Sequence, residues 1–159
     1  FQWPGRAPHE LRVAHRLHLD GVPTPEVVGF ALYPAGPGLC RCDVATRLLP
    51  AGSDLPEAWS AAASDAERTL ILERVAALLR ELQTAGARHA DLNLKNVYIS
   101  AALPRLAWVL DVDRVSFGAP CAQEVADRNL ARLLRSARKW RDTKGLPITE
   151  AQLEQLSAM

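Results

Sequence analysis

Hydrophobic and polar positions follow two distinct periods along the chain, and these divide it into helical and extended segments. Apolar residues recur every three or four positions over 66–85 and 122–141, which is the spacing of one helix face. Apolar runs bounded by turn residues predict strands instead. The expected elements, in order, are a helix from Pro8 to Gly21, strands over 27–33 and 39–49 joined by a turn over 34–38, a loop over 50–56, a helix over 66–85 with Asp65 as its N-cap, strands over 97–99 and 106–110 joined by a turn over 100–105, a helix over 122–141, and a short final helix capped by Thr149.

A polar segment, His89-Ala-Asp-Leu-Asn-Leu-Lys-Asn96, joins the first long helix to the next strand. It places Asp91 and Asn96 five residues apart, and a second carboxylate, Asp111, follows the next apolar run. Transfer of a γ-phosphoryl group requires a carboxylate within reach of the acceptor hydroxyl and hard oxygen ligands for Mg²⁺. The spacing therefore predicts a phosphoryl-transfer site in which Asp91 is the base or orienting group and Asn96 and Asp111 are metal ligands.

Residues beside these three extend the candidate site. The same loop supplies His89, Asn93 and Lys95, which we include with Asp91 among the catalytic residues. Asp113 is either a further metal ligand, a group that supports the ligands, or half of a solvated turn pair with Arg114. Unless the two form that solvated pair, Arg114 is expected to neutralise phosphate or a substrate carboxylate.

Composition and charge limit the environment in which the chain works. With 48% hydrophobic residues in 159 positions one ordinary core is expected, and a net charge of +1 gives no overall field toward nucleic acid. No apolar stretch approaches the roughly 20 residues of a transmembrane helix, so a soluble or peripheral protein is expected. The helix over 122–141 carries a cationic face that is either solvated or in contact with anionic lipid or sugar phosphate, made of Arg128, Arg132, Arg135, Arg138 and Lys139.

Taken together, these residues resemble the bacterial lipopolysaccharide kinases, most of all the 3-deoxy-D-manno-octulosonic acid (Kdo) kinases. The resemblance is carried by residues 89–96, the segment Val109-Leu-Asp-Val-Asp-Arg114, residues 128–136, Glu10 and the segment 22–25. It implies ATP-dependent phosphorylation of a Kdo hydroxyl of Kdo-lipid A in lipopolysaccharide core biosynthesis, with Mg²⁺. It also implies a location in the cytoplasm or, through the helix over 122–141, peripherally at the cytoplasmic face of the inner membrane.

The resemblance further implies an α+β, protein kinase-like fold with two parts. Residues 1–49 would form a truncated N-lobe, namely helix C plus a β-hairpin and hinge strand, and residues 50–159 a mainly helical C-lobe. In such a fold Glu10 pairs with a strand lysine that holds the nucleotide phosphates; the alternative is an exposed first-turn Glu favoured by the helix dipole. By the same analogy the nucleotide base lies near Thr46, Arg47 and Leu48.

Three departures from protein kinases change the expectation. Ala90 stands where regulated protein kinases carry Arg, and 112–123 lacks Ala-Pro-Glu, so switching by loop phosphorylation is not expected. Asn93 stands where the catalytic loop of protein kinases has Lys, so charge compensation falls to Lys95 or Arg114. No Gly-rich loop or strand lysine precedes Glu10, which predicts that this chain is a fragment of a longer protein and transfers phosphate poorly alone.

Two alternatives share the same residues. A small-molecule phosphotransferase of the aminoglycoside or choline type has a similar His-x-Asp, Asn and Asp arrangement and would accept a free hydroxylated metabolite. A non-catalytic pseudokinase scaffold would be indifferent to replacement of Asp91.

Overall fold

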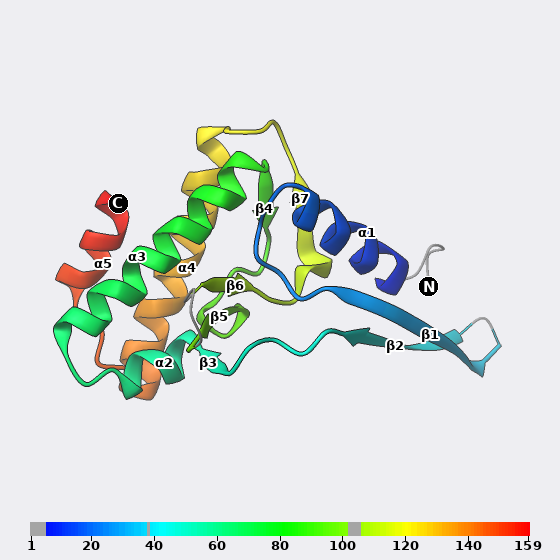
Figure 1. Cartoon of the computed structure of the whole chain (residues 1–159), viewed down its shortest axis with the longest axis horizontal. Helices are drawn as coiled ribbons and strands as arrows, with labels where there is room; N and C mark the ends of the chain where they lie inside the picture. The colour runs from blue at the N-terminus through cyan, green and yellow to red at the C-terminus, as the bar shows by residue number, and fades with distance from the viewer. Residues whose placement is uncertain (1–5, 38, 102–105) are drawn as a thin grey trace.

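The computed structural model describes residues 6–37, 39–101 and 106–159 and has a mixed α/β architecture. Figure 1 shows α1 and a long β-hairpin at one end of the molecule and the helices α2 to α5 at the other. The elements are α1 (Arg6–Leu19), β1 (Val27–Gly36), β2 (Leu39–Thr46), β3 (Gly52–Asp54), α2 (Leu55–Ala61), α3 (Asp65–Thr84), β4 (Ala87–His89), the 3₁₀ turn η1 (Leu94–Asn96), β5 (Val97–Ser100), β6 (Ala107–Val109), the 3₁₀ turn η2 (Val112–Arg114), β7 (Val115–Phe117), α4 (Gln123–Lys144) and α5 (Glu150–Ala158).

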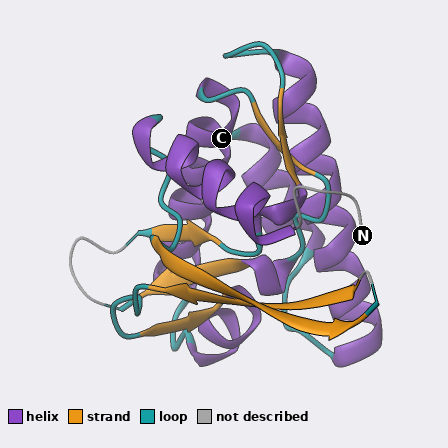
Figure 2. Ribbon diagram, turned by 90° about the vertical axis from the view of Figure 1, so that its right-hand side faces the viewer, coloured by secondary structure: helices purple, strands orange, loops and turns teal. Residues whose placement is uncertain are grey.

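Three small antiparallel sheets connect the helices. Strands β1 and β2 form the long hairpin, seen from its own end of the molecule in Figure 2. Strand β5 lies between β3 and β6, with Val97 opposite Val109, which confirms the predicted pairing of 97–99 with 106–110. Strand β4 pairs with β7, so that His89 lies opposite Val115. Residues 102–105 of the predicted turn and Gly38 of the first hairpin turn lie outside the described residues.

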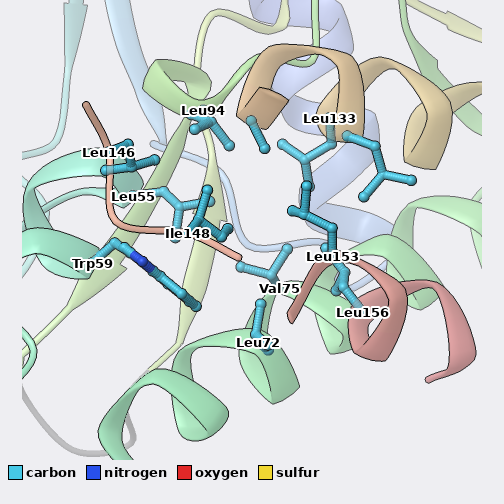
Figure 3. Close-up of a pocket in the computed structure, with 12 residues that line it drawn as sticks. Leu55, Trp59, Leu72, Val75, Leu94, Leu133, Leu146, Ile148, Leu153 and Leu156 are labelled. Carbon is cyan, nitrogen blue, oxygen red and sulfur yellow. The ribbon is translucent and has the colours of Figure 1, made fainter. Parts of the chain in front are cut away.

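The core lies between α3, α4 and the C-terminal segment. Figure 3 shows aliphatic side chains from five elements and the 145–149 loop meeting around a void of about 20 Å³, too small to hold anything larger than a water molecule. Trp59 is almost fully buried here, and its indole N–H donates to the Pro147 carbonyl at 3.0 Å. This packing fixes α2 and α5 against α3 and α4, the two long helices.

Several predicted boundaries need correction. The N-cap of α3 is Ser64 rather than Asp65, because the Ser64 hydroxyl accepts from the Glu67 backbone N–H. Helix α4 continues to Lys144, where Gly145 adopts the left-handed conformation that ends it. The β2 strand ends at Thr46, three residues before the predicted end.

The predicted loop over 50–56 was wrong, since it contains β3 and the first turn of α2. Strand β3 has only three residues and no apolar periodicity, so nothing in its composition indicated a strand. Gly52 is required there because a Cβ atom would lie 2.2 Å from the Ile99 carbonyl oxygen. Tertiary pairing with β5, which a local pattern does not encode, creates this strand.

Exposed charge pairs tie the end of α4 to α5. Arg138 and Arg141 hydrogen-bond the two carboxylate oxygens of Glu150, and they lower its pKa from 4.5 to about 2. Because the folded-state pKa is lowered, the stabilisation is present above the unfolded pKa and is lost as pH falls from about 4.5 to about 2.

We therefore expect Glu150→Gln to lower the melting temperature by a few degrees at neutral pH and to match the wild type near pH 2. The effect is small because all three side chains are substantially exposed. Melting curves between pH 7 and 2 measure it, with Glu154→Gln as the control on the same helix. A difference that persisted unchanged at pH 2 would contradict the assignment.

Candidate active site

His89 is the last residue of β4 and begins the segment that carries the predicted catalytic residues. Its ring is 1% exposed, and both nitrogens contact backbone: Nε2 lies 3.0 Å from the Leu110 carbonyl oxygen, and Nδ1 accepts from the Asp91 N–H at 3.1 Å. These bonds define a neutral tautomer with the proton on Nε2. His89 therefore connects the segments that carry Asp91 and Asp111. Its expected place among the catalytic residues stays a prediction.

Burial is the main cause of the lowered pKa of His89. It outweighs the hydrogen bond to Leu110 and the three nearby carboxylates of Asp111, Asp91 and Asp113, which act in the opposite direction. The neutral imidazole is thus maintained beside three anionic groups. Asp91, Asp111 and Asp113, separated by up to 22 residues in sequence, thus all act on the pKa of this one ring.

Asn96 connects the two halves of the site. Its side-chain N–H₂ donates to the Asp91 carbonyl at 2.8 Å, and its backbone carbonyl accepts from the Leu110 N–H at 2.9 Å. Because the side-chain nitrogen of Asn96 faces the Asp91 carbonyl, the Oδ1 atom of the same amide points away from it. Asp91, Asn96 and Asp111 are therefore brought together, as the sequence spacing predicted.

Asp111 has an unusual backbone conformation at the end of β6. Its φ of 55° and ψ of 49° lie in the left-handed region, which is uncommon outside glycine and is tolerated best by Asn and Asp. Strand β6, which precedes Asp111, is held in place because the buried Thr24 hydroxyl donates to the Val109 carbonyl at 3.0 Å. Strained residues of this kind concentrate at functional sites.

Helix α4 holds the loop through one polar stripe that the sequence analysis did not assign. Asn129 is fully buried; its Oδ1 accepts from the His89 N–H at 3.0 Å and its Nδ2 donates to the Ala87 carbonyl at 2.9 Å. One turn after Asn129, Arg132 lies 3.5 Å from the Asp91 Oδ1. One turn later again, the Ser136 hydroxyl accepts from the Leu94 N–H at 3.1 Å. Polar residues spaced three and four apart beside the leucine stripe were the available signal.

The donor set fits Mg²⁺ in the manner of nucleotide-dependent enzymes. Within the described residues no three His, Cys, Asp or Glu side chains are grouped so as to hold a metal. Magnesium in such enzymes uses only one or two protein oxygens, the remainder coming from phosphates and water. The Asn96 Oδ1 atom and the Asp111 carboxylate supply that number of hard oxygen donors.

The other predicted loop residues have different contacts. Lys95 pairs with Asp54 at 2.5 Å and lies over the Trp140 ring, and in the described part of the chain it makes no ion pair with Asp91. Asn93 caps η1, because its side-chain oxygen accepts from the backbone N–H groups of Lys95 and Asn96. Asn93 therefore stabilises the backbone of the loop, and the Lys95 ammonium group pairs with Asp54.

The residues expected near the nucleotide lie along the hairpin end. Glu10 is half-buried on α1 and is close enough to Cys42 of β2 to contribute to the raised pKa of that thiol, which is due mainly to burial. Arg47 pairs with Glu26 at 2.6 Å, and Leu48 is 94% exposed. Thr46 is exposed at the end of β2.

The second carboxylate and its neighbour lie on η2. Asp113 is half-buried, whereas the Arg114 side chain is exposed and its carbonyl accepts from the Ala90 N–H at 3.1 Å. This bond joins η2 to the loop over 89–96 next to Asp91. Asp113, like Asp91 and Asp111, contributes to the pKa of His89.

The predicted cationic face of α4 is only partly free for a ligand. Arg128 pairs with Glu124 and Arg138 with Glu150, both at 2.5 Å, while Arg132 turns toward Asp91. Arg135 and Lys139 are exposed and have no ion pair within residues 6–37, 39–101 and 106–159. Across those residues, none of the helices combines the length and the apolar character needed to cross a bilayer.

The fold and the site define a phosphotransferase layout: a buried His, a loop Asp, an Asn anchored to it, and a second Asp after the β5–β6 hairpin. Residues 4–159 match the model of the lipopolysaccharide kinase (Kdo/WaaP) family. The chain belongs to this family, as the motifs indicated.

Individual relatives agree with that placement. A 3-deoxy-D-manno-octulosonic acid kinase of Actinobacillus succinogenes is 27% identical over 162 residues, covering 92% of this chain and 60% of that protein. The protein of the same name in Haemophilus influenzae is 26% identical over 155 residues, covering 94% and 61%. In Xylella fastidiosa the match is 33% identical over 84 residues, covering 53% and 32%. The chain thus spans about 60% of the length of the first two relatives.

A solved structure, WaaP in complex with acyl carrier protein, matches with a TM-score of 0.61 at 21% identity. The match covers 94% of this chain and 76% of that chain. At this level of identity the likeness establishes a shared fold.

Proposed function

We propose that this chain carries the catalytic residues of an ATP-dependent sugar kinase that phosphorylates a Kdo hydroxyl of Kdo-lipid A. The observation that supports this most is the convergence of Asp91, Asn96 and Asp111 around the buried His89. The names of the relatives supply the acceptor.

Each residue would have a separate task. The Asp91 carboxylate, 42% exposed, would accept a hydrogen bond from the acceptor hydroxyl and orient its oxygen for attack. Mg²⁺, held with the nucleotide phosphates by Asn96 and Asp111, would neutralise charge on the transferred group. Asp113 and Arg114 would adjust the charge beside Asp111. His89 and Asn93 keep the loop in the shape that this requires.

The two parts of the chain would divide the work. Residues 1–49 would belong to the lobe that covers the nucleotide, with Thr46, Arg47 and Leu48 near the base, and residues 50–159 to the catalytic lobe. The exposed Arg135 and Lys139 of α4 would allow peripheral contact with the cytoplasmic face of the inner membrane.

The test is transfer of labelled γ-phosphate from Mg-ATP to Kdo-lipid A, comparing this chain with one extended by its upstream reading frame. We expect label from the extended chain, far less from the 159 residues alone, and a loss of about 10²-fold to 10⁴-fold on Asp91→Ala. Circular dichroism of the variant serves as the control for folding.

Other outcomes favour other functions. Phosphorylation of a free aminoglycoside or choline-like alcohol, with none of Kdo-lipid A, would indicate a small-molecule phosphotransferase. No transfer to any acceptor, together with an Asp91→Ala variant that behaves as wild type in cells, would indicate a pseudokinase scaffold.

A further inference from the structure

Arg132 forms an ion pair with Asp91, the residue proposed to orient the acceptor hydroxyl. Its Nη2 atom lies 3.5 Å from the Asp91 Oδ1, a separation longer than that of a strong charge-assisted hydrogen bond. Its Nε atom is buried and has no hydrogen-bond acceptor within the described residues. A guanidinium has five N–H donors, so this contact leaves most of them available for another acceptor.

The other arginines of α4 that form ion pairs do so differently. Arg128, Arg138 and Arg141 each lie 2.5 to 2.8 Å from a carboxylate oxygen of Glu124 or Glu150. Those three pairs are short, and none of them includes a residue of the segment 89–96. Arg132 alone among these four combines a long contact, partial burial and a position at Asp91.

We infer that Arg132 binds an anionic group of the acceptor next to the hydroxyl that Asp91 orients, and so selects acidic sugars. This inference rests on the proposed function, whose acceptor sugar is a carboxylic acid. The planar guanidinium fork matches a carboxylate in a bidentate geometry that a hydroxyl or amide cannot reproduce. The Arg132 side chain is 43% exposed, so N–H groups of its guanidinium other than the buried Nε are accessible to such a ligand.

Binding measured by titration calorimetry tests this without relying on turnover. The probes are the methyl glycoside of Kdo and the same glycoside with a neutral carboxamide in place of the carboxylate. The protein is the extended chain with Mg²⁺ and a non-hydrolysable ATP analogue. We expect wild type to bind the carboxylate form about tenfold or more tightly than the amide, as hydrogen bonds to charged groups require.

Arg132→Gln should remove that preference, Arg132→Lys should keep part of it, and Arg128→Gln, one turn earlier on α4, should keep all of it. Equal binding of the two probes by wild type, binding of neither, or equal loss in the Arg128 and Arg132 variants would overturn the inference. If Arg132 only positions Asp91, Arg132→Gln will lower kcat for both acceptors and leave the binding ratio unchanged.

The two proposals can fail separately. Transfer to Kdo-lipid A without any preference for the carboxylate form would remove Arg132 as the selecting residue and leave the sugar kinase in place. Preferential binding of the carboxylate form without phosphoryl transfer would keep the anion site and reject the kinase.

Discussion

Asp111→Asn is expected to remove nearly all phosphoryl transfer while leaving the fold unchanged. The substitution keeps the size of the side chain and removes the negative charge proposed to hold Mg²⁺ against the phosphates. Loss of this electrostatic stabilisation should lower kcat by about 10³-fold or more. Steady-state kinetics of the extended chain with Kdo-lipid A measure the effect.

The backbone at Asp111 supplies a matched control. With φ at 55°, Asn tolerates the conformation nearly as well as Asp, whereas Ala should add about 1–2 kcal/mol of strain. Both variants should be inactive, but only Asp111→Ala should lose stability in denaturant unfolding. Activity of Asp111→Asn within tenfold of wild type would show that the negative charge of Asp111 is not needed for phosphoryl transfer.

The sequence predicted the elements that have strong periodicity and the residues that have fixed spacing. Helices α3 and α4 and the β5–β6 hairpin follow from local patterns, because each buries a regular stripe of apolar side chains. The convergence of Asp91, Asn96 and Asp111 follows from the lengths of the loop and hairpin between them. These are short-range features that a single sequence specifies.

Roles that depend on contacts between residues far apart in the sequence could not be predicted from local patterns. The backbone N–H of His89 donates to Asn129 of α4, 40 residues later, and the Lys95 ammonium group pairs with Asp54, 41 residues earlier. Strands β3, β4 and β7 have three residues each and exist only because a distant partner pairs with them. The polar residues of α4 could be read from the sequence, but the loop that they contact could not be predicted.

Asn129→Ala is expected to destabilise the protein more than any other polar substitution on α4. The side chain is fully buried and satisfies the His89 N–H and the Ala87 carbonyl, neither of which can reach solvent after truncation. Two unsatisfied buried groups at about 1–3 kcal/mol each, with a small cavity, give a loss of about 3–5 kcal/mol in the free energy of unfolding. Urea unfolding of the extended chain measures it.

The exposed Arg135, on the same helix, provides the matched comparison, since Arg135→Ala should change the free energy of unfolding by less than about 0.5 kcal/mol. Asn129 also fixes the strand that leads into the catalytic loop, so the Asn129 variant should lose activity at temperatures where it is still folded. A loss of stability below about 1 kcal/mol would mean that water replaces the amide. In that case the anchoring of the loop by α4 would depend on Arg132 and Ser136 instead.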